Sequence, residues 1–335
     1  MEAVFSSSED RIRASQVAAG SPIAPHQPPA CDAEGLSKEV KLTRQSRTAD
    51  FFGAGRAWFR IAAESLFATL FPAHCRLCSR PLVDISRLPV CSDCLTLIRP
   101  IRGRVCSICG ERVFAAYATS DARGARVCPV CRRAKRPFAR AVAYGSYEGE
   151  LRELVHLLKY GCVRPAANPL GQSLALAIGL LLPGLAEKSV IVVPVPLYKG
   201  KQRQRGFNQA ELIARAALKA LPETRFELAS GVLRRVRETE SQIGLTGHER
   251  RANLRGAFAV PRTGEVTGRE VLLVDDVYTT GATVTECAGV LRRAGASQVW
   301  VATVARTLKL NTLQLQNERD AEDVEFGAAT LRAAS

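Results

Sequence analysis

The chain has 335 residues, of which 47% are hydrophobic and 24% are charged. This composition is that of an ordinary globular protein, so disorder of the whole chain is excluded, and the length favours two or three folded units. The formal charge of +15, from 47 Lys and Arg against 32 Asp and Glu, favours polyanionic partners such as nucleic acid or phosphorylated small molecules.

The N-terminal part of the chain predicts little packed structure. Residues 1–50 contain Ser, Pro, Ala and scattered charges without helical or alternating periodicity, so we expect a disordered extension. Residues 51–72 carry apolar side chains at helical spacing until Pro72, which predicts a short amphipathic helix. Only two basic residues lie within this helix, so packing on a neighbouring domain is favoured over attachment to a membrane.

No segment predicts export or a membrane span. No apolar run typical of a signal peptide follows the first residues. The longest uncharged apolar stretch, Ser173 to Leu185, is shorter than the roughly eighteen residues that a spanning helix needs. We therefore expect a cytoplasmic protein with no stable membrane insertion.

Residues 73–136 carry eight cysteines and few residues that build an apolar core, so metal must fold this segment. In each Cys-x-x-Cys pair a tight turn points both sulfurs at one ion. Twelve residues separate the first two pairs and eighteen separate the last two, within the range typical of four-cysteine zinc sites. The pairs are Cys75 with Cys78, Cys91 with Cys94, Cys106 with Cys109, and Cys128 with Cys131.

We expect a double zinc-ribbon-like module with two tetrahedral zinc ions. Four thiolates per ion leave no open position, so both sites are predicted to be structural. Sequential pairing of neighbouring pairs is the simplest assignment. An interleaved arrangement, with the first and third pairs against the second and fourth, fits the same eight residues. An iron–sulfur cluster is the minor competitor.

Residues 137–307 predict an α/β domain in which strands alternate with helices. The valine-rich run 189–196 is typical of a parallel strand buried on both faces. The arginine-rich stretch 233–258 has little hydrophobic periodicity and predicts a mobile loop. Other expected strands are 140–147, 269–276 and 297–306, and the expected helices are 148–161, 168–182, 207–221 and 282–296. The last two strands and the helix between them form a βαβ unit, and residues 308–335 are predicted to be a loosely ordered tail.

The segment Val271 to Thr283, VLLVDDVYTTGAT, is the surest functional feature. Its strand ends in Asp275 and Asp276, whose carboxylates suit ribose hydroxyls or magnesium at the edge where open α/β sheets bind ligands. A helix then begins, and its free N–H groups and positive dipole end favour a phosphate. The predicted phosphate-binding residues are Thr279, Thr280, Gly281, Ala282 and Thr283.

This segment resembles the phosphoribosyl pyrophosphate signature of type I phosphoribosyltransferases. Together with the four Cys-x-x-Cys pairs and the stretches 191–214 and 239–258, it resembles the ComF/GntX family, whose members join a zinc-binding module to a phosphoribosyltransferase-like domain. Some members are associated with DNA uptake during natural transformation. The resemblance implies a parallel sheet flanked by helices, preceded by the zinc-binding module.

The resemblance also implies roles for residues. Asp275 and Asp276 would hold the ribose hydroxyls, and Thr279 to Thr283 the 5-phosphate, of magnesium-bound phosphoribosyl pyrophosphate. Residues 196–199 are placed like the pyrophosphate loop, and 234–255 like the flexible loop that closes over the reaction centre. The basic residues implied to neutralise the pyrophosphate are Lys199, Lys201, Arg203 and Arg205. The candidate contacts from the flexible loop are Gln242, Arg250, Arg251 and Asn253.

Two functions follow from this reading. The first is an enzyme that transfers the phosphoribosyl group to an acceptor that the sequence does not identify. The alternative is a non-catalytic protein that keeps the nucleotide fold and binds single-stranded DNA or the competence machinery. Both kinds of protein bind phosphate. They differ in whether the carboxylates of Asp275 and Asp276 are required for the activity.

Overall fold

The computed structural model describes residues 73–82, 86–113, 119–120, 124–185, 189–222, 225–239 and 247–308. The extension expected over residues 1–50, the helix expected over 51–72 and nearly all of the expected tail lie outside these residues.

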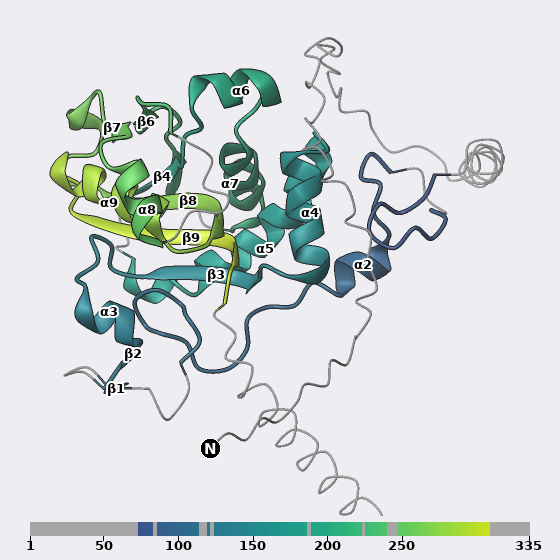
Figure 1. Cartoon of the computed structure of the whole chain (residues 1–335), viewed down its shortest axis with the longest axis horizontal. Helices are drawn as coiled ribbons and strands as arrows, with labels where there is room; N and C mark the ends of the chain where they lie inside the picture. The colour runs from purple at the N-terminus through teal and green to yellow at the C-terminus, as the bar shows by residue number, and fades with distance from the viewer. Residues whose placement is uncertain are drawn as a thin grey trace, which may run out of the picture.

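A five-stranded parallel sheet forms the centre of the protein, as the sequence predicts (Figure 1). Its strand order is β3-β9-β8-β4-β5, and every neighbouring pair runs parallel. The carboxyl ends of the strands therefore meet at one edge, which is where ligands bind in such sheets. The strands are β3 (Ala141–Ser146), β4 (Val190–Pro194), β5 (Phe226–Leu228), β8 (Glu270–Tyr278) and β9 (Gln298–Arg306).

Helices cover both faces of the sheet, which is why strand β4 is buried along its whole length. Successive strand side chains point to opposite faces: Val190 and Val192 join one core cluster, and Ile191 and Val193 join the other. The first cluster contains helices α4 (Gly149–Lys159), α5 (Ala167–Gly179) and α7 (Gln209–Ala220). The second contains α9 (Ala282–Arg293) and the end of α8 (Gly247–Leu254).

The unit formed by β8, α9 and β9 matches its prediction closely, because its apolar residues follow a clear period. The stretch 233–258, predicted to be a loop, differs. Its ends pair as a short antiparallel hairpin of β6 (Arg234–Arg235) and β7 (Phe258–Ala259), and α8 lies between them. Leu233, Leu254 and Phe258 are buried and anchor these elements, but three scattered apolar residues give no periodic signal.

Short elements complete the described chain. Helix α6 (Lys199–Arg205) follows β4 where a loop was expected. Three single-turn 3-10 helices occur at Arg164–Ala166, Leu182–Gly184 and Thr263–Glu265. Among all the helices described, none is long and apolar enough to cross a lipid bilayer.

The cysteine-rich segment forms two units that pack on different faces of the sheet. The first contains α2 (Ser92–Thr96), and its Cys75 and Cys94 belong to the same core cluster as α4. The second contains β1 (Thr119–Ser120), β2 (Arg126–Val127) and α3 (Pro129–Arg133), and its cysteines belong to the cluster of α9. Figure 1 shows them at α2 and at α3.

Candidate functional site

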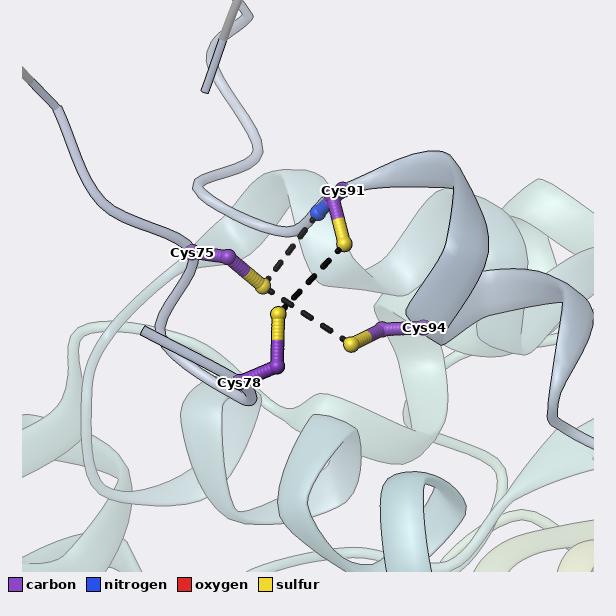
Figure 2. Close-up of side chains that lie close together, drawn as sticks. All are labelled: Cys75, Cys78, Cys91 and Cys94. Carbon is purple, nitrogen blue, oxygen red and sulfur yellow. Dashed lines mark hydrogen bonds between the residues drawn. The ribbon is translucent and has the colours of Figure 1, made fainter. Parts of the chain in front are cut away.

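The eight cysteines gather into two groups of four. The Sγ atoms of Cys75, Cys78, Cys91 and Cys94 all lie within 4.8 Å of one another (Figure 2), and those of Cys106, Cys109, Cys128 and Cys131 do the same. Neighbouring pairs in the sequence thus share a group. Of the two pairings that the spacing allows, the structure has the sequential one.

The spacing of the sulfur atoms fits a tetrahedral metal ion. A zinc ion with Zn–S bonds of about 2.3 Å places its four sulfurs roughly 3.8 Å apart. The Sγ–Sγ distances are 3.9 Å for Cys75 and Cys94 and 3.7 Å for Cys78 and Cys91. In the second group the Cys109–Cys128 distance is 3.7 Å. Four thiols at this spacing can hold one metal ion per group and leave no position for a substrate.

The two groups are copies of one local design. A residue in the left-handed region follows the first pair of each, Ser79 with φ of 60° and Gly110 with φ of 72°. The third cysteine, Cys91 or Cys128, precedes a one-turn helix. The backbone N–H of this cysteine donates to the sulfur of the first, at 3.4 Å and 3.3 Å. The groups differ in burial, because Cys78 and Cys91 are half-buried whereas all four cysteines of the second group are buried.

The two carboxylates predicted to bind ribose lie within β8, near its carboxyl end. Asp276 is only 4% exposed, and its Oδ1 forms an ion pair of 2.8 Å with the Nζ of Lys159, the last residue of α4. The other oxygen, Oδ2, is buried without a hydrogen-bond partner among the described residues. The N–H of Asp276 donates to Oδ1 of Asp275 at 2.9 Å. This edge therefore offers a fixed, desolvated oxygen atom to a ligand.

The charges at this edge shift one another's protonation. Burial, followed by repulsion from Asp276, raises the pKa of Asp275 to about 8. Burial would lower the pKa of Lys159, but the carboxylates of Asp276 and then Asp275 outweigh it and raise that pKa. Lys159 therefore stays charged beside Asp276. Lys159 was not predicted, because a lysine at the end of an amphipathic helix ordinarily has a solvent-exposed side chain.

The predicted phosphate-binding loop lies directly after this strand. Gly281 caps the N-terminus of α9 with φ of 75°, and a Cβ atom there would lie only 2.2 Å from the hydroxyl oxygen of Tyr278. Thr279 and Thr280 are exposed, and the N–H of Ala282 donates to Oγ1 of Thr280 at 3.4 Å. Glycine is thus required by both the backbone and the space. The structure brings residues 279–283 together with the two carboxylates at the N-terminus of a helix, the arrangement that binds phosphate.

A hollow of about 670 Å³ opens between the end of β4 and the hairpin of β6 and β7. Strand β4 lies beside β8, and the N–H of Val195 donates to the carbonyl of Val274 at 2.8 Å. The end of β4 that lines the hollow therefore lies beside Val274, the residue that precedes the two carboxylates. Residues with polar groups that line it include Tyr198, Lys199, Gln202, Ser230, Arg234 and Arg235.

The predicted basic residues are distributed unevenly around this hollow. Lys199 lines it, whereas Lys201 and Arg203 are exposed on α6. Arg205 donates to Oε1 of Gln209 at 3.0 Å and lies over the ring of Tyr160.

The flexible-loop residues are only partly described. Arg250 and Arg251 belong to α8, although their side chains lie outside the described part, as does Gln242. Asn253 is half-buried, and its carbonyl accepts a hydrogen bond of 2.7 Å from Arg237.

Arg235 is a second residue that sequence analysis missed. It lines the hollow and lies over the ring of Phe258, at 5.6 Å from the ring centroid. Burial lowers its pKa, and the attraction of Asp275 opposes that shift. A half-buried guanidinium that lines the hollow is well placed for an anionic ligand. No sequence pattern distinguishes it from the neighbouring arginines of the stretch 233–258.

The chain is similar to several known proteins. The phosphoribosyl transferase domain family matches residues 205–326, which include β8, the predicted phosphate-binding loop and α9. The DNA utilization protein YhgH of Escherichia coli is 32% identical over 244 residues, which cover 71% of this chain and 98% of that protein. Competence protein F of Haemophilus influenzae is 30% identical over 241 residues, covering 70% of this chain and 95% of that protein.

A more distant relative extends the same group. Competence protein ComFC of Bacillus subtilis is 25% identical over 197 residues, covering 58% of this chain and 74% of that protein. The similarity to the first two relatives spans nearly their whole length.

Proposed function

Because the chain belongs to the ComF/GntX family of phosphoribosyltransferase-domain proteins, we propose that it binds phosphoribosyl pyrophosphate with Mg²⁺ and transfers the phosphoribosyl group to an acceptor. In such a transfer the bond between the ribose C1 and the pyrophosphate oxygen breaks. A bond from C1 to the acceptor nucleophile forms, and the acceptor releases its proton to solvent.

The observation that carries this proposal is the unpartnered oxygen of Asp276. A buried carboxylate oxygen without a partner costs free energy, roughly 1–3 kcal/mol or more for a charged group. Lys159 holds the carboxylate in place through its other oxygen. An arrangement that keeps one oxygen fixed and unsatisfied suits a ligand hydroxyl, which restores the missing hydrogen bond. A ribose supplies two such hydroxyls side by side.

In this proposal, neighbouring groups bind the remaining parts of the ligand. The N–H groups at the start of α9 face the 5-phosphate, and Gly281 lets the backbone approach it closely. Lys199 and Arg235 line the hollow proposed for the pyrophosphate and stabilise its charge as the bond to C1 breaks. Mg²⁺, when bound, neutralises the leaving group. Oxygen atoms of Asp275, Asp276 and the pyrophosphate are the hard donors that this ion prefers.

We also assign zinc to both cysteine groups and the cytoplasm as the compartment. Tetrahedral sites of four thiolates select zinc or iron–sulfur centres, and zinc fills such sites where the role is structural. The reduced thiols that such sites need favour a reducing compartment.

The proposal is tested by binding and turnover together. Calorimetric titration with phosphoribosyl pyrophosphate and Mg²⁺ is expected to show saturable binding, and pyrophosphate release is expected with one member of an acceptor panel. The double substitution Asp275→Asn and Asp276→Asn should abolish release. Asp93→Asn, at a carboxylate 65% exposed and outside the site, is the matched control and should leave release unchanged. Full activity of the double variant would show that the site is elsewhere.

A second function is supported by the names of the relatives and by charge. The relatives are called DNA utilization and competence proteins, and this chain carries a formal charge of +15. The corresponding proposal is a non-catalytic protein that binds single-stranded DNA. Its affinity should then fall steeply with salt, because each phosphate contact releases counterions. An affinity that is flat in salt, or that depends on the two carboxylates, would contradict it.

A further inference from the structure

The second cysteine group is connected to the sheet by one buried arginine. Arg306, the last residue of β9, is 4% exposed. Its guanidinium donates 2.6 Å to the carbonyl of Cys109 and 2.8 Å to a carboxylate oxygen of Glu111, and lies 3.9 Å from the sulfur of Cys109. All three contacts are made to the turn that carries two of the four thiols.

The same guanidinium also touches the residue that supports the phosphate-binding loop. Its central carbon lies 4.2 Å from the centroid of the Tyr278 ring, within the range of a cation–π contact. Tyr278 lies directly beneath Gly281, as the space for a Cβ atom there shows. A continuous line of contacts therefore runs from Cys109 through Arg306 and Tyr278 to Gly281.

A second arginine makes a parallel connection. Arg136, shortly after the last cysteine of the group, donates to Oγ1 of Thr285 at 3.3 Å. Thr285 belongs to the first turn of α9, and its N–H donates to the carbonyl of Gly281 at 2.9 Å. Burial would lower the pKa of Arg136, but Tyr278 and then Cys131 outweigh burial and raise it. Both arginines thus face the cysteine group and the start of α9.

Metal binding gives this connection its dependence on metal. An ion held by the four thiols of the second group ties the turn that carries Cys109 to the other half of the group. The contacts of Arg306 with Cys109 and Glu111 are all made to that turn. Loss of the ion frees the turn, and the contacts that hold Arg306 over Tyr278 weaken.

The first group lacks such a connection. Its neighbouring arginine, Arg80, pairs with Asp93 at 3.0 Å, and both side chains are more than 60% exposed. No hydrogen bond or ion pair among the described residues links Arg80 to the phosphate-binding loop. Arg80 is therefore a matched control for Arg306.

We propose that Arg306, assisted by Arg136, is a positioning residue that makes the geometry of the phosphate-binding loop depend on the metal ion in the second cysteine group. The phosphate affinity of the protein then follows occupancy of that group and not of the first. The ligand part of this inference rests on the proposed function; the structural part does not.

The test uses the full chain loaded with zinc and the variants Arg306→Met and Arg80→Met. Amide hydrogen exchange of residues 279–285, zinc content and calorimetric affinity for ribose 5-phosphate are measured for each. Arg306→Met should speed exchange in residues 279–285 about tenfold or more, and it should weaken binding of ribose 5-phosphate by a similar factor. Arg80→Met should change neither. Chelation that empties the second group of the wild type should reproduce the effect of Arg306→Met.

Three results overturn the proposal. They are unchanged exchange in residues 279–285 of Arg306→Met, unchanged exchange after the second group loses its metal, and an equal effect of Arg80→Met. If Arg306→Met does not fold, Arg306→Lys takes its place in the test. Lysine keeps the positive charge but cannot make the same set of contacts, so the same three results would overturn the proposal. Failure of the wild type to bind ribose 5-phosphate would contradict the proposed function, whereas the exchange measurement would still decide the coupling.

Discussion

Tyr278 and Arg306 are register partners at the carboxyl ends of β8 and β9, and the Arg306 guanidinium lies over the Tyr278 ring. Tyr278 is buried, and burial raises the pKa of its hydroxyl to about 12, so the ring stays neutral at physiological pH. The pair lies at the carboxyl edge of the sheet, where Arg306 also contacts the second cysteine group. Above the Tyr278 ring, position 281 has room for glycine but not for a residue with a Cβ atom.

Gly281→Ala is therefore expected to damage the phosphate-binding loop. The substitution adds a Cβ atom that overlaps Tyr278, at a residue with φ of 75°. A strained residue of this kind costs about 1–3 kcal/mol, which denaturant unfolding measures, and affinity for ribose 5-phosphate should fall at least tenfold. Gly179→Ala is the control, because open space surrounds that helical glycine and alanine favours the helix. Equal behaviour of the two variants would contradict the packing described here.

Lys159→Met is expected to destabilise the protein. The substitution leaves Asp276 as a buried charge without its partner, and such a loss costs about 3–5 kcal/mol; the side chains are 16% and 6% exposed. The free energy of unfolding is measured for Lys159→Met, Asp276→Asn and the double variant. The double variant should be more stable than the sum of the single effects predicts. Additive effects would show that the ion pair contributes nothing.

The raised pKa of Asp275 predicts a pH dependence. Its pKa is about 8 in the folded state, against an ordinary value of 3.8. The folded state therefore binds this proton more tightly, and the carboxyl lowers stability progressively as pH rises from about 4 to about 8. Asp275→Asn cannot titrate. Its melting temperature should exceed that of the wild type by a margin that grows over this range and is constant above pH 8.

Thermal melts at five pH values, without magnesium or phosphate, measure that margin. A margin for Asp275→Asn that does not vary with pH would contradict the raised pKa. Asp275→Asn should also lose affinity for phosphoribosyl pyrophosphate. Asp275 would then lower the stability of the protein while it contributes to ligand binding.

Metal analysis should find two zinc ions per chain, one for each group of four thiols. Removal of both should lower the melting temperature, because structural zinc contributes directly to folding free energy. The second group should lose its metal more slowly, since all four of its cysteines are buried whereas two of the first group are half-buried. One zinc ion per chain, or none, would contradict the assignment.

Much of the site follows from local sequence. Asp275 and Asp276 end a valine-rich strand, and Gly281 begins a helix, so these neighbours share one edge of the sheet whatever surrounds them. The same holds for each Cys-x-x-Cys pair, since a turn of two residues fixes the distance between its sulfurs. Interactions between near neighbours leave a clear pattern in the sequence.

The missed elements have weak local signals. Helix α6 and the hairpin of β6 and β7 are short, polar and arginine-rich, and they depend on a few buried contacts such as those of Leu233 and Phe258. Periodicity cannot identify an element of two to seven residues. Their formation is decided by the rest of the domain against which they pack.

The sequence alone determined the parallel sheet, the order of its predictable elements, the eight cysteines of the two groups and the loop from Val271 to Thr283. Only the tertiary structure decided which cysteine pairs share a group, that Lys159 holds Asp276, and that Arg306 joins the second group to Tyr278. The physical reason is the separation along the chain over which each kind of interaction acts. Hydrophobic period and turn geometry act between residues close in the chain, whereas buried charges find their partners only after the sheet has brought distant segments together.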